Sequence, residues 1–93
     1  MKVSSASHIK RTKDCAFQKI VGRMVVVYPR ERALHRLNEI GTSIWEFIGN
    51  GCKFSEIVDF IASEYEVERN TAEKDLKNFL AELHEKKLVI IKE

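Results

Sequence analysis

The strongest constraint on the fold of this 93-residue chain is a change of hydrophobic period between Arg32 and Trp45. Up to Leu37 the residues suit a short, half-apolar strand, and beyond it apolar residues recur at helical spacing. Asn38 stands at the change and has the short acceptor side chain that is favoured at a helix N-cap. We therefore expect sheet before this point and mostly helix after it. The length fits one compact α+β domain with a single core.

Three strands are expected before Asn38. Phe17–Val21 and Met24–Tyr28 are rich in β-branched and aromatic residues, and Gly22-Arg23 between them fits a tight turn. Pro29 ends the second strand because it has no N–H for the ladder. With Ala33–Leu37 these runs predict a three-stranded antiparallel meander whose third strand lies at an edge.

Three helices and one short strand are expected after Asn38. The first helix ends at Gly49-Asn50-Gly51, the second begins with Ser55 as its cap, and the third runs from an Asn70 cap to about Lys86-Lys87. Leu88–Ile91 forms a final strand, so the helical part is compatible with a winged helix-turn-helix. Residues 1–13 lack a periodic apolar signal, and we expect a flexible arm there ahead of a single domain at residues 14–93.

The sequence offers no pattern of a catalytic, metal or membrane protein. No apolar run approaches the roughly 20 residues of a membrane span, and the N-terminus lacks the apolar stretch of a signal peptide. Cys15, Cys52 and the three histidines have neither zinc-ligand spacing nor a catalytic context. We therefore expect a cytoplasmic, non-enzymatic protein without cofactor or metal.

Charge is divided unevenly along the chain. Residues 1–37 hold nine Lys or Arg and two acids, whereas residues 38–93 hold seven and twelve. A winged-helix nucleic-acid-binding regulator stays open as an alternative, but the mixed and acidic surfaces expected for the second and third helices disfavour contact with phosphates. A structural subunit that forms a homodimer through its sheet edge is a third possibility.

The exposed edge of the third strand favours peptide binding, because an extended peptide can pair with its free N–H and C=O groups. Leu34, Leu76 and Phe79 would supply apolar contacts between this strand and the third helix, although Leu76 and Phe79 also suit a plain core. Arg32 and Arg36 would favour an acidic peptide. Reversing the charge at Arg36 should then weaken binding without unfolding the domain.

The motif Leu37-Asn38-x-x-Gly41-x-x-Ile44-Trp45 is followed by Asp75-Leu76-x-x-Phe79-Leu80-x-x-Leu83. In order and spacing it resembles PqqD-like proteins, named for coenzyme PQQ synthesis protein D. The resemblance implies a non-catalytic peptide chaperone of ribosomally synthesised, post-translationally modified peptide pathways. Such a protein binds a leader peptide as an extra strand and delivers it to a modifying enzyme such as a radical SAM enzyme. The expected peptide-binding residues are Arg32, Leu34, His35, Arg36, Leu37, Asp75, Leu76 and Phe79.

Overall fold

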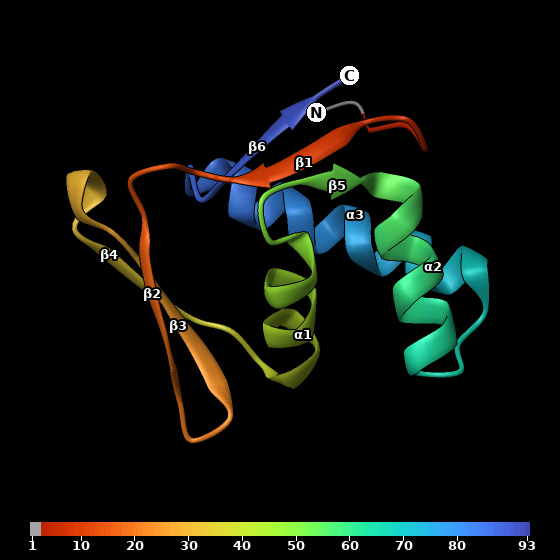
Figure 1. Ribbon diagram of the computed structural model, residues 1–93, viewed down its shortest axis with the longest axis horizontal. Coiled ribbons are helices and arrows are strands. Elements are labelled where there is room, and N and C mark those ends of the chain that lie inside the picture. The colour runs from red at the N-terminus through yellow and green to blue at the C-terminus, as the bar shows by residue number, and fades with distance from the viewer. Residues whose placement is uncertain (1–2) are drawn as a thin grey trace.

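The structure is a computed structural model that describes residues 3–93. Two small antiparallel sheets and three helices form an α+β domain, with one sheet beside the helices and the other above them (Figure 1). The predicted fold class, with its three-stranded meander, three helices and C-terminal strand, is confirmed. Among the described residues no helix is long and apolar enough to cross a membrane.

The sheet beside the helices is the predicted meander. It comprises β2 (Ala16–Ile20), β3 (Arg23–Tyr28) and β4 (Ala33–Arg36), in the order β2-β3-β4. The turn between β2 and β3 is Val21-Gly22, with φ of 48° and 77°, so the predicted Gly22-Arg23 turn was wrong by one residue. Both turn residues adopt the positive φ of a type I′ hairpin, which Gly tolerates and Val does not favour.

A short 3-10 helix, η1 (Pro29–Glu31), joins β3 to β4. Arg32 follows it in the left-handed conformation, and its N–H donates to the carbonyl oxygen of Pro29 at 3.2 Å. The chain therefore turns sharply before β4 begins.

The helices are α1 (Glu39–Ile48), α2 (Phe54–Glu64) and α3 (Arg69–Glu85). Asn38 caps α1 as predicted, since its Oδ1 accepts the N–H of Gly41 at 2.7 Å. The predicted caps of the other two helices were wrong. Lys53 and Glu68 occupy those positions, and Ser55 and Asn70 lie within the first turns.

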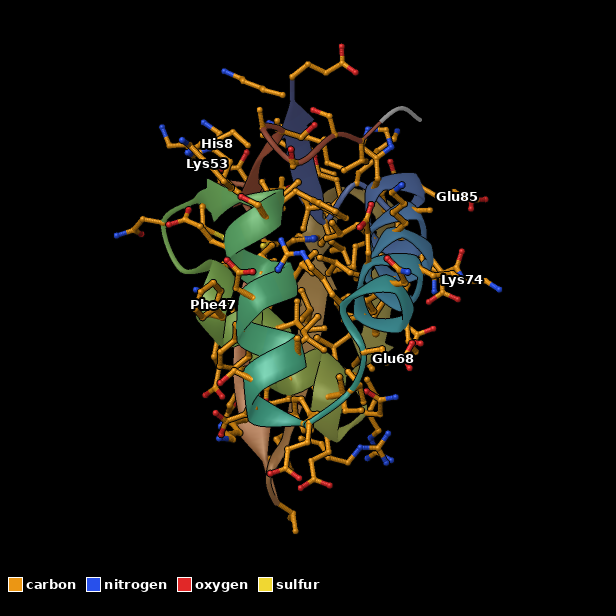
Figure 2. All side chains as sticks on the ribbon, turned by 90° about the vertical axis from the view of Figure 1, so that its right-hand side faces the viewer. His8, Phe47, Lys53, Glu68, Lys74 and Glu85 are labelled. Carbon is orange, nitrogen blue, oxygen red and sulfur yellow. The ribbon has the colours of Figure 1, made fainter. Side chains whose placement is uncertain are left out.

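The second sheet corrects the expectation of a flexible arm at residues 1–13, since residues 8–11 form a strand; residues 1–2 of that range lie outside the described part of the chain. Its central strand is β1 (His8–Arg11), which pairs with β5 (Cys52–Lys53) on one side and β6 (Val89–Lys92) on the other. In Figure 2, His8 and Lys53, which pair across β1 and β5, lie together at one end of the molecule. Ile9 is completely buried. The C-terminal strand thus pairs with the N-terminal strand and forms no hairpin wing.

The core lies where the two sheets meet the helices. Trp45 on α1 is completely buried at its centre. Arg11 on β1 donates to the carbonyl oxygen of Trp45 from Nη2 and Nε, at 2.6 and 3.1 Å. The same guanidinium lies 4.5 Å from the ring centre of Phe17 on β2. One arginine therefore connects both sheets to α1.

Candidate functional site

The open edge of β4 is the first component of the site. Within residues 3–93, β4 pairs with β3 and has no strand on its other side. The N–H of Leu37 donates to the carbonyl oxygen of Met24 at 2.8 Å, which fixes the phase of the ladder. Because hydrogen bonding alternates along an antiparallel strand, the N–H and C=O groups of Leu34 and Arg36 point to the open side. These groups are available to an added strand.

The side chains of β4 alternate between two faces of the sheet. His35 pairs with Val26, which is completely buried, so His35 faces the helices. Leu34 and Arg36 are exposed and face away from the helices, next to the half-buried Val27 and Val25. Leu34 therefore lies on the face opposite to the third helix, and the expected apolar contact between them was wrong.

A hollow of about 470 Å³ separates β4 and η1 from the C-terminal end of α3. We call it the β4–α3 hollow; its lining residues are Glu31, His35, Glu82, Glu85, Lys86 and Lys87. Lys87 Nζ lies 2.9 Å from Glu31 Oε1, and this ion pair joins η1 to the turn after α3. The ion pair marks the end of the hollow nearest to the start of β4.

Among the described side chains of β4, that of His35 lines this hollow. Its Nε2 is inaccessible to solvent and has no hydrogen-bond partner among the described residues. Burial, and after it the charge of Lys86, lowers the pKa of His35. The ring is therefore neutral at pH 7 and has one nitrogen without a partner.

A second, more apolar hollow of about 270 Å³ lies between the three helices. We call it the interhelical hollow; its lining residues are Asn38, Ile40, Gly41, Ile44, Ile61, Tyr65, Val67, Asp75, Leu76 and Phe79. Gly41 lies directly against Phe79, since a Cβ at this position would be 3.1 Å from Cε1 of the ring. The close approach accounts for glycine at this place in the motif.

The two hollows follow one another along a single face of α3. Asp75 and Phe79 line the interhelical hollow, and Glu82 and Lys86 line the β4–α3 hollow. These four residues are spaced four, three and four apart, which places them on one side of a helix. A segment lying along this face would meet an apolar surface first and charged side chains later.

The structure brings together only part of the predicted site. His35 lies in one hollow and Asp75 and Phe79 in the other, while Leu76 is completely buried beneath the second. Leu37 is a core residue and lines neither hollow, although we expected it to contact a peptide. Arg32 and Arg36 are exposed and likewise line neither hollow.

The acidic and basic residues at the end of α3 were not predicted to be part of the site. Glu82 and Lys86 follow Phe79 at three and seven residues, and this helical spacing could have identified them from the sequence. Because they are mixed in sign, the β4–α3 hollow is not the arginine-lined groove that we expected.

The two thiols lie apart from these hollows. Cys15 and Cys52 are free and half-buried. Burial raises the pKa of both, that of Cys52 to about 11, which disfavours the reactive thiolate at neutral pH.

A family model described as coenzyme PQQ synthesis protein D (PqqD) matches residues 23–89. This span includes β3, β4, all three helices and the start of β6. The chain belongs to the PqqD family. Both hollows and the open β4 edge lie within the PqqD match.

Two solved structures are similar to this PqqD-family chain. One is TbiB1 in complex with the TbiA(beta) leader peptide, at 31% identity and a TM-score of 0.76, covering 86% of this chain and 93% of that one. The other is lasso peptide synthetase B1 complexed with the leader peptide, at 22% identity and a TM-score of 0.74, covering 88% and 96%. The second likeness shows the fold alone. No curated protein matches the chain.

Proposed function

We propose that this PqqD-family chain binds the leader segment of a ribosomally made precursor peptide and presents it to a modifying enzyme. The observation that carries the proposal is the open edge of β4, where Leu34 and Arg36 direct unpaired N–H and C=O groups toward an added strand. The leader extends the sheet by one strand beside α3. The chain itself needs no catalytic group, cofactor or metal for this role, which it performs in the cytoplasm.

The structure of TbiB1 supports this assignment, because it is a complex with a leader peptide. The family match supports it independently, since it covers the strand and the helix that border the proposed site. The comparisons give no support to the nucleic-acid-binding alternative. A radical SAM enzyme is the candidate class for the modifying enzyme that the resemblance to PqqD-like proteins implies.

Strand addition gives the two faces of the bound leader different environments. Side chains on the inner face of the leader lie toward His35 and along the Phe79 side of α3. They therefore meet polar groups in the β4–α3 hollow and apolar groups in the interhelical hollow. Side chains on the outer face lie beside Leu34 and Arg36 as cross-strand neighbours. Arg36 favours an acidic residue at one of these outer positions.

Replacing Leu34 by proline tests the backbone pairing, because proline removes the N–H that an added strand would use. Edge strands tolerate proline where the N–H faces solvent, so the fold is retained. We expect Leu34→Pro to weaken binding of a fluorescent synthetic leader by about tenfold, since one backbone hydrogen bond is lost and its partner left unsatisfied.

The matched control is Leu34→Ala, which shortens the same exposed side chain and keeps the N–H. It should weaken binding less than proline does. Equal affinities of the wild type and the proline variant, with both folded by circular dichroism, would exclude strand addition at this edge.

A further inference from the structure

The face of the β2–β3–β4 sheet that points away from the helices is an unpartnered apolar surface. The register pairs Val25 with Arg36, Val27 with Leu34, and Arg23 with Ile20, so these six side chains share one face. We call it the outer face. The opposite positions on β3 are Met24 and Val26, both buried against the core.

The outer face is open to solvent over its apolar residues. Ile20 is 48% exposed and Leu34 is 66% exposed. The three helices all lie on the other side of this sheet, as Figure 1 shows for the described part of the chain. Apolar residues gathered on a sheet surface of this kind commonly mark a protein interaction site.

The charges of the outer face define the partner. Arg23 and Arg36 flank the apolar residues, and none of the outward positions on the three strands holds an acid. Acids near this sheet are engaged elsewhere: Asp14 with Arg30, Glu31 with Lys87, and Glu46 with Lys19, whose side chain lies on the helix-facing side of β2. The complementary surface therefore has an apolar centre and acidic residues around it.

A second copy of this chain does not fit that description. A two-fold symmetric dimer would place the same patch against itself. Each copy would then contribute two arginines and no acid to the contact, and like charges at an interface oppose association.

We propose that the outer face binds the modifying enzyme, and that the enzyme contributes an apolar patch bordered by acidic residues. This proposal rests on the proposed leader-binding function. The face borders the open edge of β4, so a leader added there widens it by one strand. The enzyme then contacts both this chain and the outward side chains of the leader. It should bind the leader complex more tightly than the free chain.

The test measures binding of the purified modifying enzyme, encoded with the precursor, to the immobilised chain with and without synthetic leader. Ile20→Glu places a negative charge in the apolar patch, two strands away from the β4 edge. We expect it to raise the Kd for the enzyme about tenfold and to leave leader affinity unchanged. Gln18→Glu, which faces outward on β2 beside Val25, should raise the Kd by a smaller factor with minimal change of shape.

Ile90→Glu on β6 is the matched control, because Ile90 is also a partly exposed isoleucine on a strand, but of the other sheet. It should leave both affinities unchanged. Wild-type affinity for the enzyme in both Ile20→Glu and Gln18→Glu would overturn the proposal. So would absence of enzyme binding by the wild type, or a dimer in sedimentation velocity that Ile20→Glu abolishes. A failure of the wild type to bind leader would instead refute the proposed function. The enzyme titration of the free chain would then still show whether the outer face binds the enzyme.

Discussion

At the scale of single residues, His35 is unusual in the burial of its ring nitrogen. It occupies an edge strand, yet its Nε2 is shielded from solvent and unpaired among the described residues. Because side chains alternate along a strand, His35 and Leu34 take opposite faces of β4, and the expected contact of Leu34 with the third helix was on the wrong face. The identity of the groups opposite it was not predictable, because Glu82, Glu85 and Lys86 come from the end of α3 and the residue that caps it, about fifty residues further along the sequence.

The lowered pKa of His35 makes stability depend on pH in a defined direction. Burial and Lys86 reduce proton affinity in the folded state, whereas the unfolded chain keeps an ordinary pKa of about 6.5. The unfolded state therefore binds more protons as the pH falls through that value. The stability contributed by the neutral ring is complete above about pH 6.5 and is lost on acidification toward the lowered pKa.

We expect His35→Gln to lose less thermal stability than the wild type between pH 7.5 and pH 5.5. Melting curves followed by circular dichroism measure this difference. His84→Gln, which replaces an exposed histidine on α3, is the control and should follow the wild type. Parallel pH dependence of the wild type and His35→Gln would contradict the account.

At the scale of elements, local patterns predicted the hairpin, the edge strand and the Asn38 cap of α1. These features depend on neighbours within a few residues, which a sequence displays directly. The turn between β2 and β3 was misplaced by one residue because the glycine suggested a turn that begins there. Register instead follows pairing of the strands, which puts Val21 in the first turn position.

Val21→Asn should stabilise the domain. A left-handed conformation costs a non-glycine residue about 1–2 kcal/mol, and Asn-Gly is the favoured pair for this turn. Val21 is 96% exposed, so no packing is lost. We expect a gain of about 1 kcal/mol, or roughly 4–8 °C in the melting temperature.

Val21→Ala is the control for this prediction, since it removes the exposed side chain but keeps a residue unsuited to the turn. It should gain much less than asparagine. A melting temperature for Val21→Asn at or below that of the wild type would show that the turn conformation is wrong.

At the scale of the whole molecule, the N-terminal segment is part of the domain. β1 carries one buried apolar residue, Ile9, in a polar surrounding sequence, so nothing local predicted a strand. Its partners β5 and β6 lie more than forty and about eighty residues away. The interhelical hollow escaped prediction for the same reason, because it depends on how three separate helices pack.

Ile9→Ala should destabilise the protein by about 2–4 kcal/mol, the usual cost of emptying a buried isoleucine site. Lys10→Ala, which changes the neighbouring exposed residue, should cost less than about 0.5 kcal/mol. Urea unfolding at constant pH compares the two. Equal stabilities of both variants would contradict the strand β1 and support a flexible arm instead.

The central claim concerns the open edge of β4, and amide hydrogen exchange tests it most directly. In the free protein the amides of Leu34 and Arg36 should exchange fast, while that of Leu37, bonded to Met24, exchanges slowly. Saturating leader peptide should slow exchange at Leu34 and Arg36 and leave Leu37 unchanged. A leader that binds while these two amides continue to exchange fast would contradict strand addition at β4.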